Sequence, residues 1–133
     1  MSPWRMSRHF LGAKPSVTEA RRFVTTFLKG WPLVGDAELI VSELATNAIR
    51  HSASGRFGGR FVVTIQVAAD RLWLGVLDEG GPRAPKIFRR NGEVETGRGL
   101  LIVSEIAADW GVFGDEQGRT VWAVLDLEES SCR

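Results

Sequence analysis

One polar stripe along a predicted helix carries residue types suited to phosphate chemistry. Glu43, Asn47 and His51 follow one another at helical spacing, so they lie along one edge of that helix. The amide oxygen of Asn47 is a hard ligand suited to Mg²⁺, which takes few protein ligands and otherwise binds water and phosphate oxygens. Glu43, one turn earlier, could orient or deprotonate an attacking hydroxyl or water. A solvated helix edge with a surface Glu–Asn pair is the alternative that this pattern leaves open.

A second cluster stands where a predicted strand ends. Asp78 is followed by Glu79, Gly80 and Gly81. A carboxylate at this place could accept a hydrogen bond from an exocyclic amine, and the glycines would let the backbone come close to a ligand. An ordinary Gly-Gly turn after a strand is the alternative.

The third cluster is Gly97-Arg98-Gly99-Leu100, a glycine pair that leads into a predicted helix. A helix start offers free N–H groups and the positive end of the helix dipole to a phosphate, although such loops are common. It is not the dinucleotide fingerprint, because the third glycine is missing and no strand immediately precedes it. The chain also lacks a Gly-x-x-x-x-Gly-Lys-Ser/Thr sequence, which excludes a P-loop. It has no Gly-x-Ser-x-Gly elbow, so esterase chemistry has no candidate nucleophile.

The elements that must position these clusters follow from hydrophobic periodicity. A capping box formed by Ser16 and Glu19 predicts the start of a first helix, which Gly30 and Pro32 end. The predicted order is helix, helix, hairpin, long loop over 79–96, helix, hairpin. Hairpins require antiparallel pairing, so the three helices must pack on one face of a mostly antiparallel sheet, in an α+β two-layer sandwich. The later helices are expected over 36–51 and 100–108, and the strands over 60–67, 72–78, 110–113 and 119–127, with 1–11 as an N-terminal arm or edge strand.

The apolar positions of these elements define the expected core. They are Val17, Ala20, Val24, Phe27 and Leu28 in the first helix, Ile40, Val41, Leu44, Ala45 and Ala48 in the second, and Phe61, Val63, Ile65 and Val67 in the first hairpin.

Composition narrows the class of protein. The length of 133 residues suits one domain, and 44% hydrophobic with 25% charged residues is ordinary for a globular chain. Cys132 is the single cysteine, which excludes an intramolecular disulfide and, with two histidines, a Cys/His metal cluster. A net charge of +1 argues against direct nucleic-acid binding, and no apolar run suits a signal peptide or a membrane span. We therefore expect a cytoplasmic protein that binds neither nucleic acid nor membrane.

Taken together in this order, the three clusters resemble the N, G1 and G2 boxes of Bergerat-fold ATP-binding proteins. The resemblance covers about residues 16–127. It implies that 1–133 is a single histidine-kinase-like ATPase domain with its core in that range. Within that superfamily the chain is similar to the short anti-sigma-factor serine/threonine kinases of actinobacteria. The segments that carry this similarity are 41–51, Gly97-Arg98-Gly99-Leu100 and Gly118-Arg119-Thr120-Val121-Trp122.

The resemblance implies a role for each matching residue. Asn47 would bind Mg²⁺, Glu43 would be the general base, and Asp78 would accept the adenine amino group with support from Thr120. The other nucleotide contacts that it implies are Gly80, Gly97, Arg98, Gly99 and Leu100.

One position departs from the family pattern. The G1 box usually reads Asp-x-Gly-x-Gly, and Pro82 stands at its fifth position. The resemblance implies that the loop over 79–96 forms a lid over the nucleotide. Proline fixes φ and lacks an N–H, so the hinge of this predicted lid is stiffer and one donor is missing.

Two functions of different classes follow from the resemblance. The first is an ATP- and Mg²⁺-dependent kinase that phosphorylates a serine on an anti-sigma-factor antagonist, a STAS-type domain, and otherwise sequesters a sigma factor in transcription regulation. The second is a nucleotide-gated binding module that switches a partner without phosphotransfer. A homodimer stays open in either case.

Overall fold

The chain folds into one five-stranded sheet with its helices on a single face. The computed structural model describes residues 3–51, 58–68, 70–80 and 98–126. In chain order the elements are β1 (Trp4–Leu11), α1 (Pro15–Phe27), α2 (Val34–His51), β2 (Arg60–Ala68), β3 (Arg71–Asp78), α3 (Arg98–Ile106), β4 (Asp109–Asp115) and β5 (Gly118–Asp126).

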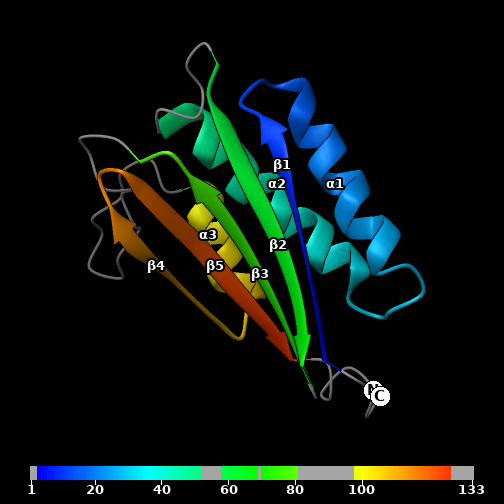
Figure 1. Ribbon diagram of the computed structural model, residues 1–133. Coiled ribbons are helices and arrows are strands. Elements are labelled where there is room, and N and C mark those ends of the chain that lie inside the picture. The colour runs from blue at the N-terminus through cyan, green and yellow to red at the C-terminus, as the bar shows by residue number, and fades with distance from the viewer. Residues whose placement is uncertain (1–2, 52–57, 69, 81–97, 127–133) are drawn as a thin grey trace.

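The sheet order is β1-β2-β3-β5-β4, and each neighbouring pair is antiparallel. All three helices lie behind the sheet in Figure 1, with α2 between α1 and α3. The predicted α+β sandwich is therefore confirmed. Of the two possibilities for the N-terminal segment, the edge strand is correct, because β1 pairs with β2 along its whole length.

The core lies between the helices and the sheet. The strands alternate with a period of two, so Phe61, Val63, Ile65 and Val67 of β2 all face the helices and are buried, as predicted. The five apolar positions predicted for α2 are buried as well. None of the described helices is both long enough and apolar enough to cross a membrane.

The start of α1 differs from the prediction. The capping box is wrong, because the helix begins at Pro15 and its N-cap, Lys14, makes no side-chain hydrogen bond. Proline suits the first helical position, since its φ is already helical and its missing N–H would have had no partner there. Ser16 consequently lies inside the first turn and is buried.

The inner face of α1 also shifts slightly from the predicted one. Phe23 is buried in the core, whereas Phe27 is exposed. The ring of Phe27 lies 6.2 Å from that of Trp4 on β1 and 5.3 Å from that of Phe23. This aromatic group closes the edge of the core beside β1.

Candidate functional site

The polar edge of α2 faces away from α1. Arg21 of α1 forms a salt bridge of 3.0 Å with Glu38, which marks the flank of α2 that lies beside α1. At 3.6 residues per turn, Asn47 is about 180° and Glu43 about 140° around the helix from Glu38. Since α2 also contacts α3, both half-buried side chains lie on the flank toward α3. The stripe thus borders the buried face of α2 on its α3-facing flank.

Asp78 is a buried carboxylate at the end of β3, on the helix-covered face. It is only 7% exposed, and its Oδ1 accepts a hydrogen bond of 2.6 Å from the backbone N–H of Gly80. Burial raises the pKa of Asp78 above its usual value, because the charged form loses water. The Gly80 hydrogen bond, the charge of Arg119 and the backbone N–H of Arg119 oppose this shift, and Glu79 adds to it. An acceptor this sheltered suits selective recognition of one donor.

Gly80 has a structural reason to be glycine. Its φ is +72°, and a Cβ at this position would lie 2.2 Å from the carbonyl oxygen of Glu116. The chain leaving β3 therefore runs directly against the turn between β4 and β5, which a side chain would prevent. The N–H of Gly80 is engaged by Asp78, so this glycine shapes the wall around that carboxylate.

The role expected for Thr120 needs correction. The β3–β5 register pairs Leu77 with Thr120 and Asp78 with Arg119. Directly opposed residues of antiparallel strands share a face, so Thr120 lies on the sheet face opposite to Asp78. Thr120 is 8% exposed, and its other cross-strand neighbour is Phe113 of β4.

Arg119 occupies the place that we expected Thr120 to fill, and sequence reasoning missed it. It is 5% exposed and on the same face as Asp78. The signal was present in the alternation of β5, where Val121, Ala123 and Leu125 are buried on the helix-covered face and Arg119 continues the series.

The start of α3 supplies the remaining part of the site. The helix begins at Arg98, and the first four N–H groups of a helix have no partner within it. Leu100 is buried in the hydrophobic core, so its side chain fixes this end of α3 under the sheet. Gly99 belongs to the first turn of α3. Gly97, Pro82 and the side chains of Arg98 and His51 lie outside the described residues.

The structure brings these parts to one side of the sheet. Helix α2 contacts β3, β5 and α3, so Asn47, Asp78 and the start of α3 belong to elements that pack together. Among the described residues, no group of three or more His, Cys, Asp or Glu side chains could hold a metal ion.

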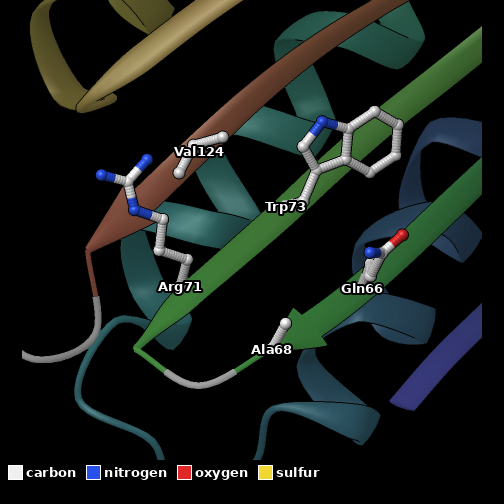
Figure 2. A pocket seen from close by; sticks show the side chains of 5 residues that line it. All are labelled: Gln66, Ala68, Arg71, Trp73 and Val124. Carbon is white, nitrogen blue, oxygen red and sulfur yellow. The ribbon is translucent and has the colours of Figure 1, made fainter. Parts of the chain in front are cut away.

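A separate pocket lies on the uncovered face of the sheet. It has a volume of about 220 Å³ and is lined by Gln66, Ala68, Arg71, Trp73 and Val124. Figure 2 shows these side chains standing on β2, β3 and β5, on the side away from the helices. Asp78 points to the other face, so this pocket is not part of the site.

A helix-backed antiparallel sheet with a polar helix edge, a buried aspartate at a strand end and a helix start beside them defines the ATP-binding domains of the Bergerat fold. The chain belongs to the histidine kinase-like ATPase domain family, whose match spans residues 12–125. Its expected resemblance to Bergerat-fold proteins is thereby confirmed.

Among solved structures, the fold is similar to the crystal structure of the RsbU and RsbW domains of Rv1364c from Mycobacterium tuberculosis. The TM-score is 0.68 at 17% sequence identity, over 92% of this chain and 32% of the other. The chain thus spans about a third of the length of that protein. No curated protein matches the sequence.

Proposed function

We propose that this protein is an ATP-dependent serine kinase that phosphorylates an anti-sigma-factor antagonist and otherwise sequesters a sigma factor. The observation that supports this proposal most directly is that Glu43 and Asn47 share the flank of α2 that faces α3, one helical turn apart. The family match supports ATP as the nucleotide, and the sequence resemblance supports the protein partners, a STAS-type antagonist and a sigma factor.

Each residue of the site has a part in the proposed reaction. Asp78 accepts a hydrogen bond from the adenine amino group, and the N–H groups that open α3 hold phosphate oxygens. Asn47 would hold Mg²⁺ through its amide oxygen, and the ion would neutralise phosphate charge. The serine oxygen attacks the γ-phosphorus and the bond to the β–γ bridging oxygen breaks, which releases ADP. Glu43 accepts the serine proton, so the products are phosphoserine, ADP and a proton on Glu43.

A second candidate function is supported by one residue, Pro82. Pro82 stands where the family's G1 box has a glycine, which stiffens the predicted hinge and removes one N–H. A domain that binds nucleotide and changes its affinity for a partner, without transferring phosphate, needs no such donor. The two candidates differ in one observable, the appearance of phosphoserine.

The test is phosphate transfer from labelled ATP to a panel of STAS-type antagonist domains. Glu43→Gln should keep ATP affinity, because the side chains are nearly isosteric, and lose about 10²–10⁴-fold in transfer rate. Glu38→Gln is the matched control, with the same chemical change on the opposite flank of α2 and little expected effect on transfer. Transfer by Glu43→Gln at the wild-type rate would remove Glu43 from the mechanism. ATP binding by the wild type without transfer to any domain of the panel would favour the binding module.

A further inference from the structure

Arg119 is a charged residue buried where the proposed reaction gives it no task. Arginine is almost never fully buried unless it is paired, and Arg119 is only 5% exposed. It stands directly across the β3–β5 ladder from Asp78, on the same helix-covered face. Two opposite charges that are buried on the same face of a sheet interact more strongly than they would in water.

We propose that Arg119 is the positioning residue of base recognition, which holds the Asp78 carboxylate ionised and aimed as a hydrogen-bond acceptor for an exocyclic amine. This inference rests on the proposed function in one respect, that the site takes an adenine nucleotide. It adds that selectivity for adenine over guanine depends on a cross-strand pair and not on Asp78 alone.

The geometry gives Arg119 two ways to act on Asp78. Its backbone N–H and its positive charge both favour the ionised carboxylate, while burial favours the neutral form. The Gly80 N–H, 2.6 Å from Oδ1, fixes the direction of one oxygen. An ionised carboxylate is an acceptor only, whereas a protonated one carries an O–H that donates. Loss of the Arg119 charge should therefore weaken adenine recognition first at low pH.

Other charged groups act on Asp78 less directly. Glu79 follows it in the chain and raises its pKa. The Glu79 side chain accepts a hydrogen bond of 3.1 Å from the backbone N–H of Arg60, at the start of β2. Two acidic residues of α2, Asp36 and Glu43, lie on its α3-facing flank, and neither is among the groups that shift the pKa of Asp78. Of the groups that act on Asp78, Arg119 alone supplies positive charge within the described residues.

A purely structural role for Arg119 makes different predictions. If its hydrocarbon stem merely fills space under the sheet, any side chain of similar length would serve equally. Lysine and methionine both approximate that stem, but only lysine keeps the charge. Thr120 supplies a control on the next residue, because its side chain lies on the other face of the sheet.

The experiment measures ATP and GTP affinity by calorimetry from pH 5 to 8, in the full chain. ATP affinity should fall on acidification, and we call that part of the pH profile the acid limb. In Arg119→Met the acid limb should lie about one pH unit higher, and the preference for ATP over GTP should fall about tenfold. Arg119→Lys should retain most of both properties, and Thr120→Val should match the wild type. A wild-type pH profile in Arg119→Met, or equal losses in the Lys and Met variants, would overturn the proposal.

Two further measurements keep the test decisive. If Arg119→Met does not fold, Asp78→Asn should abolish the acid limb, and a limb that persists would overturn the proposal. Carbon-13 NMR titration of the Asp78 carboxyl in the nucleotide-free protein separates this inference from the proposed function. A wild type that fails to bind ATP, with an Asp78 pKa that still rises in Arg119→Met, contradicts the function and leaves the coupling intact. An Asp78 pKa that does not rise contradicts the coupling itself.

Discussion

Replacing Gly80 with alanine should destabilise the protein strongly, because two separate costs coincide at this position. The φ of +72° places an L residue in the left-handed region, at about 1–2 kcal/mol. The new Cβ would lie 2.2 Å from the carbonyl oxygen of Glu116 and 2.9 Å from the nitrogen of Gly118. Backbone atoms cannot rotate away, so the β4–β5 turn must move, which resembles overpacking at about 1–3 kcal/mol. We expect a loss of about 3 kcal/mol, a large share of the ~5–15 kcal/mol typical of a domain.

Gly30→Ala is the matched control for this prediction. Gly30 has a φ of +87°, but a Cβ there would meet nothing within 4 Å. The control therefore carries the left-handed cost without the clash. Alanine also reduces the entropy of the unfolded chain to the same extent in both variants, so the difference between them isolates the close approach. Urea unfolding, followed through the five tryptophans, gives both free energies. Equal losses in the two variants would refute the contact between the β3 exit and the β4–β5 turn.

Three further predictions concern the remaining parts of the site. Asn47→Ala should weaken Mg·ATP binding in calorimetry while leaving the free energy of unfolding nearly unchanged, since its side chain is only half-buried at a polar margin. Leu100→Ala should lower the free energy of unfolding by about 2–5 kcal/mol in urea, because it leaves a cavity under α3. Burial raises the pKa of Asp78 in the folded protein, so its contribution to stability is lost as the pH rises through that raised value. Asp78→Asn should therefore increase the free energy of unfolding of the nucleotide-free protein at pH 7 relative to wild type, measured by urea unfolding from pH 4 to 8.

The parts of the fold that follow from periodicity could be predicted from the sequence. The apolar face of α2 and the alternation of β2 depend on side-chain spacing alone, and the hairpins then dictate antiparallel pairing. The start of α1 could not be predicted in this way, because a capping box and a first-turn proline compete within five residues of sequence. Proline at the first helical position prevailed, since it needs no side-chain partner.

The sequence predicted which segments contribute to the candidate site. It did not predict on which face of the sheet each side chain lies. Glu43 and Asn47 lie on one helix, where spacing alone sets their common edge, and the structure places that edge beside α3. Thr120 and Arg119 are neighbours in sequence, yet their side chains lie on opposite faces of the sheet. A strand's period is two, so an error of one residue in the inferred register exchanges the two faces completely. Motif similarity points to the first residues of β5. Only the pairing with β3 shows that Arg119, and not Thr120, shares a face with Asp78.

The β4–β5 turn matters to the candidate site although none of the predicted site residues lies in it. The N–H of Gln117 bonds the Asp115 carboxylate at 2.9 Å, which holds the turn against the chain leaving β3. That turn fixes where β5 begins, and the start of β5 fixes which residue stands across from Asp78. A one-residue shift of the β3–β5 register would place a residue of opposite orientation across from Asp78, although every motif residue would remain in the sequence. The proposed base recognition therefore depends on the β3–β5 register as well as on the presence of Asp78.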